Sequence, residues 1–353
     1  MVLDRFLAEK LPKTDLHCHL DGSLRCETLI ELAKKYGISL SSYEAEPLMA
    51  MMGYGRVRKN LLDYIASFEP LIAIMQCHEA IERIAYEVCE DAYLENVWHL
   101  ELRFCPYLHT KKGLTAEEVV RAAIEGADRA RKNFGISVGF ILCGLKNDKE
   151  SNVFEVAKLA VQFRKAGVVG FDLAGPEAGF PISNHLEAIY YARRNHLFIT
   201  LHAGENSGPE SIREAIHEAG AHRIGHGTSL IDDPDLIEYV VDHRISIEAC
   251  PISNWHTGSV RSVSDHPLKK FLQAGARVSI NTDNRLCSDT SITEEIMAVS
   301  EDLKLDQNEI KQLLENGFKS AFLPYSSRAL MIKAFNEQWN KIMQERDSLK
   351  LAD

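Results

Sequence analysis

The apolar positions of this chain follow two patterns in turn, a short strand-like run and then a longer stretch with helical spacing. Apolar residues that recur every three or four positions are typical of a helix packed against a sheet, whereas short apolar runs are typical of strands. Helical spacing covers residues 26–36, 77–93, 115–132, 150–165, 184–194, 209–219, 233–241 and 266–274. Strand-like runs cover residues 14–20, 98–104, 137–145, 168–174, 198–203, 223–226, 245–250 and 277–282. The pattern therefore predicts eight βα units.

Eight βα units favour a (β/α)8 barrel of the TIM type over an open, doubly wound sheet. Strands that alternate with helices pair in parallel, and eight of them close into a barrel. An open sheet would be expected to carry a glycine-rich phosphate loop after an early strand, but the sequence contains no GxGxxG or Walker motif. We therefore expect a single α/β domain over residues 1–353, with extra helices after the first strand and at the C-terminus.

Two segments lie outside the alternation, and we expect both to be helical. Residues 292–350 have helical spacing throughout and no Gly-Pro linker, so we expect them to pack around the barrel. Residues 41–93 form a predicted helical lid insertion, which begins with a Met-rich stretch. From Asn60, one helical stripe contains Leu61, Tyr64, Ile65 and Phe68. Such a stripe usually packs into the core, but here it could also form the apolar roof of a pocket.

Composition and charge narrow the possible partners. The net charge of −11 leaves no basic surface for a nucleic-acid backbone. No apolar run is long enough to cross a bilayer, and the N-terminal MVLDRFLAEKLPK lacks the apolar core of a secretion signal. The eight cysteines stand singly, without CxxC pairs, which indicates a reducing compartment. We expect a cytoplasmic protein with a small-molecule partner, and its oligomeric state stays open.

A histidine pair within the stretch TDLHCHLDGS, at residues 14–23, is the first candidate for chemistry. Alternate side chains of a strand share one face, so His17 and His19 point the same way. Two imidazoles on one face can bind Zn²⁺. An isolated HxH also occurs by chance, so the pair alone leaves the metal and non-metal interpretations open.

Three later strands also end in polar groups, where barrel enzymes carry their chemistry. The fifth strand ends in His202 and Glu205, the sixth in His226, and the eighth in Asp283. Each of these residues alone has an ordinary structural explanation, such as an N-cap for Asp283. Together, three histidines and one aspartate suit a Zn²⁺ site with an open position for water, and Glu205 and His226 remain as an acid and a base beside it.

The motifs KTDLHCHLDGSLR, FDLAGPE, LHAGE, RIGHG, EACPISN and SINTDN occur in this order between residues 13 and 284. In this ordered set, the chain resembles the adenosine deaminase family of zinc-dependent amidohydrolases. The resemblance implies hydrolytic deamination of adenosine and 2′-deoxyadenosine to inosine and deoxyinosine, a reaction of purine salvage. It implies one Zn²⁺ per chain, held by His17, His19, His202 and Asp283.

The same resemblance implies roles for the remaining candidates. Glu205 would protonate the purine N1, His226 would orient and deprotonate the attacking water, and Asp283 could also accept that proton. The implied substrate contacts are His19, Asp21 at the ribose, Gly175 at the purine N3, Asn284 at N7, and the lid residues Leu61, Tyr64, Ile65 and Phe68.

Asn284 departs from the pattern of many members, which have a second Asp there, but an amide can donate the same hydrogen bond at any pH. Asp21 is more typical of nucleoside deaminases than of adenine deaminases, which tend to carry Glu.

Two alternatives to adenosine deamination stay open. One is a related 6-aminopurine substrate, namely aminodeoxyfutalosine, N6-methyl-AMP or adenine. The other is a non-catalytic nucleoside-binding protein, which would require missing metal ligands or a secretion signal, and the sequence shows neither.

Overall fold

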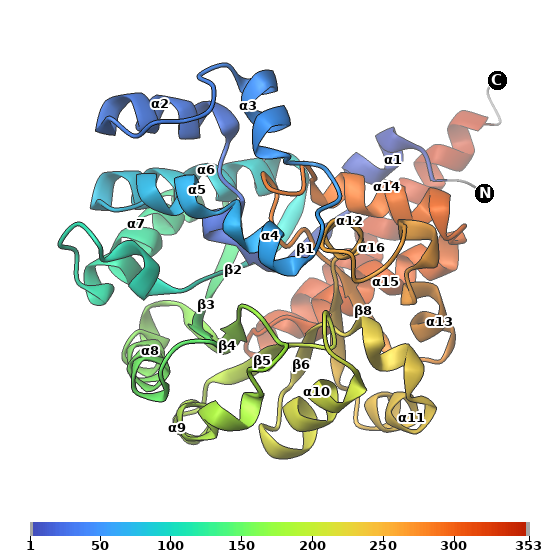
Figure 1. Ribbon diagram of the computed structural model, residues 1–353. Coiled ribbons are helices and arrows are strands. Elements are labelled where there is room, and N and C mark those ends of the chain that lie inside the picture. Colours follow the sequence, from blue (N-terminus) through green and yellow to red (C-terminus); the bar gives the residue numbers. More distant parts are fainter. Residues whose placement is uncertain (1–2, 351–353) are drawn as a thin grey trace.

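A computed structural model describes residues 3–350 and contains eight parallel strands in a nearly closed barrel, surrounded by helices (Figure 1). The strands are hydrogen-bonded in sequence order, β1 to β8, so the predicted (β/α)8 class is confirmed. Their bounds are β1 Lys13–His19, β2 Val97–Phe104, β3 Ser137–Leu145, β4 Val168–Ala174, β5 Phe198–Ala203, β6 Arg223–His226, β7 Ser246–Ala249 and β8 Arg277–Ile280.

The barrel closes where the loop after β8 pairs with β1. The N–H of Asp283 donates to the carbonyl of His17, and the N–H of His19 donates to the carbonyl of Asp283, both at 2.7 Å. These two hydrogen bonds hold the histidine pair against an aspartate that lies more than 260 positions away in the sequence. The closure of the fold therefore also assembles the candidate metal ligands.

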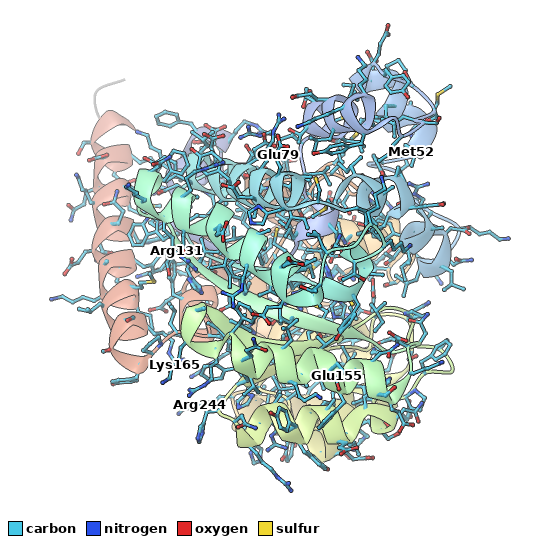
Figure 2. All side chains as sticks on the ribbon, turned by 90° about the vertical axis from the view of Figure 1, so that its left-hand side faces the viewer. Met52, Glu79, Arg131, Glu155, Lys165 and Arg244 are labelled. Carbon is cyan, nitrogen blue, oxygen red and sulfur yellow. The ribbon has the colours of Figure 1, made fainter. Side chains whose placement is uncertain are left out.

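The helices that follow the strands agree closely with the predicted ranges. One predicted helix, residues 209–219, is instead a short α-helix followed by a π-helical turn over Glu214–Glu218. The helices between the strands are α7 Ala116–Phe134, α8 Glu150–Gln162, α9 Leu186–Arg194, α10 Pro209–Arg213, α11 Pro234–Asp242 and α13 Leu268–Gln273. Figure 2 shows the outer side of the helical layer, where Glu79, Glu155 and Lys165 are exposed to solvent.

Two short helices were not predicted. Helix α1, Arg5–Lys10, precedes the first strand, and α12, Pro251–His256, follows β7. The sequence PISNWH of α12 has too few residues for a helical repeat to show, although Pro251 at its first position is typical of a helix start. Two side chains of helix α12, Ser253 and Asn254, form hydrogen bonds with the predicted site residues Asp283 and His226.

The segment predicted as a lid, residues 41–93, is helical and follows α2 Cys26–Tyr36, which ends at Gly37 as predicted. The predicted stripe is broken, because α4 ends at Ala66 and Phe68 lies in the turn before α5. Pro70 lacks an N–H and restricts the residue before it, so a continuous helix is disfavoured there. The helices of this segment are α3 Ala45–Met52, α4 Leu61–Ala66, α5 Glu69–Ile74 and α6 His78–Leu94, and α6 packs against α7 and β2 on the outside of the barrel.

The C-terminal segment is helical, as predicted, with two breaks. It consists of α14 Ile292–Asp302, α15 Gln307–Ser320 and α16 Tyr325–Lys350. Helix α15 packs against β1 and β8, and a Cβ atom at Gly317 would lie only 2.1 Å from Oγ1 of Thr14, so the close approach requires glycine. Among residues 3–350, no helix is both long and apolar enough to span a bilayer.

Candidate active site

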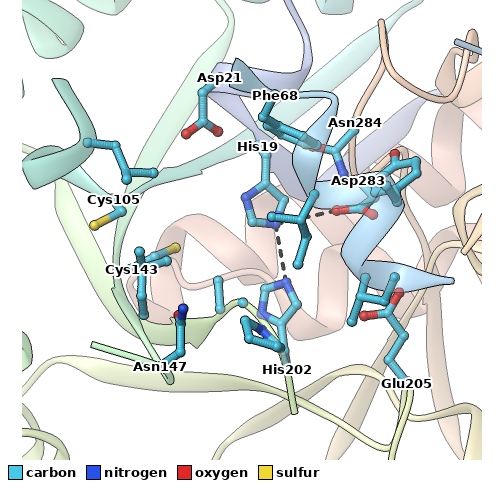
Figure 3. Close-up of a pocket in the computed structure, with 18 of the residues that line it drawn as sticks. His19, Asp21, Phe68, Cys105, Cys143, Asn147, His202, Glu205, Asp283 and Asn284 are labelled. Atoms are coloured by element: carbon cyan, nitrogen blue, oxygen red, sulfur yellow. Dashed lines mark hydrogen bonds and ion pairs between the residues drawn. The ribbon is translucent and has the colours of Figure 1, made fainter. Parts of the chain in front are cut away.

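The predicted site residues converge on one cavity of about 220 Å³ at the carboxyl ends of the strands (Figure 3). His17 lies just beneath it and is completely buried. Every other predicted residue is part of the lining, which includes His19, Asp21, Leu61, Tyr64, Ile65, Phe68, Gly175, His202, Glu205, His226, Asp283 and Asn284. The lid stripe is thus the roof of a pocket, the less common of the two interpretations.

Four ligand atoms face a common point. The Nε2 atoms of His17 and His19 lie 3.1 and 3.2 Å from Nε2 of His202, and both lie 3.4 Å from Oδ1 of Asp283. Ligand atoms about 2.1 Å from a tetrahedral centre lie about 3.4 Å from one another. The spacing therefore fits four side-chain ligands around a small cation such as Zn²⁺, which can expand to five-coordinate and accept a water.

A second combination, with His226 in place of His19, also brings its ligand atoms within 4.8 Å of one another. In the predicted set, four atom pairs that join His17 or His19 to His202 or Asp283 lie 3.1–3.4 Å apart, which is close to the spacing expected around a tetrahedral ion. Because a tetrahedral site needs the shorter spacing, we favour the set that contains His19. His226 then lies beside the metal position.

Buried carboxylates fix the orientation of two of the histidines. Nδ1 of His17 donates to Oε2 of Glu248 at 2.8 Å, and Nδ1 of His202 donates to Oδ2 of Asp172 at 2.9 Å. A carboxylate can only accept, so each ring carries its proton on Nδ1 and turns the lone pair of Nε2 toward the common point. Arg103 joins the two carboxylates, at 3.0 Å from Asp172 and 2.7 Å from Glu248.

These three ionic side chains are completely buried. Burial by itself would raise the pKa of Glu248, but Arg103 and Arg223 beside it hold that pKa well below its usual range. Burial by itself would also raise the pKa of Asp172. The neighbouring His202 and Arg103 outweigh this effect and hold the pKa of Asp172 below its usual range. Both carboxylates therefore stay ionised and can orient the metal-ligating rings.

Asp283 and His226 have unusual backbone conformations. Their φ angles are +60° and +66°, in the left-handed region that few non-glycine residues adopt. Such conformations cluster at functional sites. Ser253 on α12 donates to Oδ2 of Asp283 at 2.5 Å, which leaves Oδ1 directed at the metal position.

Glu205 lies in an environment that favours its protonated form. Its carboxyl group is buried, and Oε2 lies 3.6 Å from Nε2 of His226. Burial raises the pKa of Glu205 to about 8, and the negative charges of Asp283 and Glu177 add to this effect. Near neutral pH, Glu205 is therefore a carboxylic acid that can donate a proton into the cavity.

Three polar positions lie farther from the metal position. Gly175 has a φ of +88°, and Asp21 lies with Oδ2 3.6 Å from Nε2 of the buried His109. Asn284 packs against Gly22, where an added Cβ atom would lie 2.0 Å from its Oδ1, and this oxygen has no hydrogen-bond partner. The amide NH₂ of Asn284 is thus the group left to serve a ligand in the cavity.

Several functional residues were missed at the level of sequence. Arg103, Asp172 and Glu248 lie within the predicted strands, and each is a charged residue in a run with apolar residues on both sides of it. That contrast was an available signal, because a charge is rarely buried without a partner. The cavity also receives Cys105 and Cys143, which Figure 3 shows on the side opposite Asp283. No pattern in the sequence indicated these two.

Comparison with known proteins finds relatives over most of the chain. The sequence profile of the family described as adenosine deaminase matches residues 12–338. The adenosine deaminase of Enterococcus faecalis is 36% identical over 330 residues, which are 94% of this chain and 97% of the relative.

Solved structures share the fold. An adenine deaminase from Arthrobacter aurescens has a TM-score of 0.87 and 25% identity, covering 94% of this chain and 99% of that chain. The N6-methyl-AMP deaminase of Arabidopsis thaliana has a TM-score of 0.81 and 28% identity, covering 95% and 98%. A Burkholderia ambifaria amidohydrolase with bound Zn, at a TM-score of 0.89, 22% identity and coverage of 98% and 94%, shares the fold alone.

Proposed function

This chain belongs to the adenosine deaminase family, and we propose that it hydrolyses adenosine and 2′-deoxyadenosine to inosine and deoxyinosine with release of ammonia. The observation that carries the proposal is one cavity in which four candidate ligand atoms spaced for a metal lie beside the buried carboxyl group of Glu205, whose pKa is raised by burial. Neither group alone would specify this reaction, because metal sites and raised carboxyl pKa values both occur elsewhere.

We assign Zn²⁺ to His17, His19, His202 and Asp283. Three imidazoles and one carboxylate are typical zinc ligands, and the spacing of their donor atoms supports this metal. When bound, the ion supplies a water that is activated for attack near neutral pH.

The roles of the chain's own residues follow from their chemistry. Glu205 donates its proton to the purine N1, which withdraws electron density from C6 and makes that carbon electrophilic. The oxygen of the attacking water bonds to C6, and the proton of the water passes to a group beside the cavity. His226 and Asp283 are the residue types there that can take it. The group that took this proton passes it to the 6-amino group, which leaves as ammonia, while the hydroxyl proton left at C6 returns to Glu205 as the C6 carbonyl forms.

The lining supports a nucleoside over a nucleotide. Among the described residues that line the cavity, none is Lys or Arg, and Asp21 adds a carboxylate. A phosphate would meet negative charge without a cation to pair with, whereas a ribose hydroxyl would find an acceptor in Asp21. We place the purine N3 at Gly175 and N7 at the amide of Asn284, under the apolar roof of Leu61, Tyr64, Ile65 and Phe68. His19 lines the same space.

A substrate panel tests the proposal. Purified enzyme would be given adenosine, 2′-deoxyadenosine, adenine, N6-methyl-AMP and aminodeoxyfutalosine, and the loss of the adenine absorbance would be followed. We expect the highest kcat/KM for adenosine and 2′-deoxyadenosine, and loss of activity with a zinc chelator. A clear preference for adenine or N6-methyl-AMP would contradict the assignment.

We place the reaction in purine salvage in the cytoplasm. All eight cysteines are unpaired in the structure, which supports a reducing compartment.

A further inference from the structure

A chain of hydrogen bonds ends on His226 from behind. The backbone N–H of Leu268, the first residue of α13, donates to Nδ1 of His266 at 3.1 Å. Nε2 of His266 lies 3.2 Å from Oδ1 of Asn254 on α12, and Nδ2 of Asn254 lies 3.0 Å from Nδ1 of His226. All three side chains are buried. We refer to Leu268 N–H, His266, Asn254 and His226 as the His226 relay.

The relay can be read in only one direction, because its first group is a backbone N–H, which always donates. Nδ1 of His266 must therefore accept, so the ring proton of His266 is on Nε2. Nε2–H then needs an acceptor, which only the oxygen of Asn254 provides. The amide nitrogen of Asn254 is left to donate to Nδ1 of His226. The assignment of the amide and of both tautomers thus follows from one unambiguous donor.

The consequence for His226 is that its proton lies on Nε2. Nε2 lies 3.6 Å from Oε2 of Glu205, and His226 belongs to the group of ligand atoms within 4.8 Å around the metal position. His17 and His202 have the opposite tautomer, because their Nδ1 atoms face carboxylates. The site therefore contains rings that offer a lone pair and one ring that offers an N–H.

We propose that Asn254 and His266 are positioning residues that hold His226 as a neutral hydrogen-bond donor, neither a base nor a metal ligand. The proposal deepens the proposed deaminase function and rests on it for its catalytic meaning. With no lone pair on Nε2, His226 orients the attacking water and stabilises negative charge on its oxygen. The oxygen of the water then bonds to C6, while its proton passes to Asp283 and the proton of Glu205 passes to N1.

The tautomer can be measured directly. Enzyme labelled with ¹⁵N-histidine and carrying its metal would be examined by NMR, and the ring nitrogens of His226 would be identified by their absence in His226→Gln. We expect an unprotonated Nδ1 and a protonated Nε2. The reverse pattern, or a metal-bound nitrogen, would overturn the proposal. This measurement needs no substrate, so it stands or falls separately from the proposed function.

Asn254→Asp tests the catalytic meaning, because a carboxylate in this place accepts from Nδ1 of His226 and moves the ring proton off Nε2. If NMR shows this reversal, we expect kcat for adenosine to fall at least about tenfold with KM changed less than threefold. Undiminished or higher kcat would mean that His226 acts as a base. If Nε2 stays protonated, kcat should stay within about threefold of the native value, and a larger loss would also contradict the proposal.

Asn316→Asp provides the matched control. Asn316 is a buried asparagine on α15, outside the relay and the cavity. It adds a buried carboxylate without touching His226, so we expect kcat per folded molecule to stay within about twofold of native. A loss as large as that of Asn254→Asp would show that any new buried charge has this effect, and it would overturn the proposal.

Discussion

Glu205 is a buried carboxyl group, and its pKa differs strongly from that of an exposed glutamate. A free glutamate is ionised at neutral pH and cannot act as an acid there, but burial raises the pKa of Glu205 to about 8. The charges that add to the shift come from Asp283 and Glu177, on two other loops of the barrel. Its surroundings thus favour the protonated form of Glu205 that the proposed reaction needs.

This shift predicts the pH dependence of turnover. The protonated form of Glu205 is the active one, so kcat should be highest below about pH 8 and fall as the pH rises through that value. Glu205→Gln cannot donate the proton, and we expect it to keep the metal while losing about 100-fold or more of kcat. Measurements of kcat from pH 6 to 10 for the native enzyme and for Glu205→Gln check both the pH profile and the loss of turnover, with metal content as the control. Turnover that rises through pH 8 would contradict the assignment.

Gly22 is the residue that seats Asn284. A methyl group there would lie 2.0 Å from Oδ1 of Asn284, so Gly22→Ala must displace the amide. The proposed hydrogen bond from this amide to the purine N7 would then be lost, at a cost of about 1–3 kcal/mol, or about 5- to 150-fold in kcat/KM. The double variant Gly22→Ala/Asn284→Ala should be no worse than Asn284→Ala alone. If the two losses multiply, Gly22 acts by another route.

At the scale of the elements, the interiors of β2, β4 and β7 orient the ligands that β1 and β5 carry. Arg103, Asp172 and Glu248 come from these three strands, and their hydrogen bonds run across the barrel to His17 and His202. A barrel brings such residues together because the inward side chains of all its strands meet in its interior.

Arg103→Met should therefore destabilise the protein. The variant keeps the volume of the side chain but leaves the buried Asp172 without its guanidinium partner and Glu248 with Arg223 alone, at a cost of about 3–5 kcal/mol. Thermal unfolding followed by circular dichroism should show a lower midpoint than native, and metal content should also fall. Arg103→Lys, which keeps one charge but loses the fork, should lie between. A midpoint of Arg103→Met equal to native would refute the role given to this ion pair.

A side-chain hydrogen bond joins helix α4 to the loop after β8. The hydroxyl of Tyr64 lies 2.7 Å from Oγ of Ser288, on the loop that also carries Asp283. Tyr64→Phe keeps the apolar roof but loses this bond, so we expect KM for adenosine to rise about threefold to tenfold with little change in kcat. Leu62→Ala, on the exposed side of the same helix, is the control and should leave both unchanged. Equal effects of the two variants would contradict this role.

The elements also show what sequence patterns can and cannot predict. All eight strands were found within a few residues, because an apolar run between polar turns is a local signal. Helix α12 was not, since its six residues are too few for a periodic pattern. Even so, it carries Ser253 and Asn254. Their hydrogen-bond partners are Asp283, in the loop after β8, and His226, at the end of β6. The tautomers of the histidines depend on such partners and cannot be read from a sequence alone.

At the scale of the whole molecule, the closure of the barrel brings the first strand and the loop after the last strand together. The loop after β8 pairs with β1 to close the barrel, and the same contact places Asp283 against His17 and His19. The ligand set was predictable because the carboxyl ends of barrel strands meet at one rim. Its exact membership needed distances, since His226 also lies close enough to be considered.

The content of zinc per chain tests the central claim most directly. Elemental analysis of purified native enzyme should give about one zinc per chain. His226→Ala should keep this value, because His226 is not a ligand, and His19→Ala should fall well below it. Native enzyme without bound metal, or a His226→Ala variant that loses the metal while His19→Ala retains it, would contradict the account.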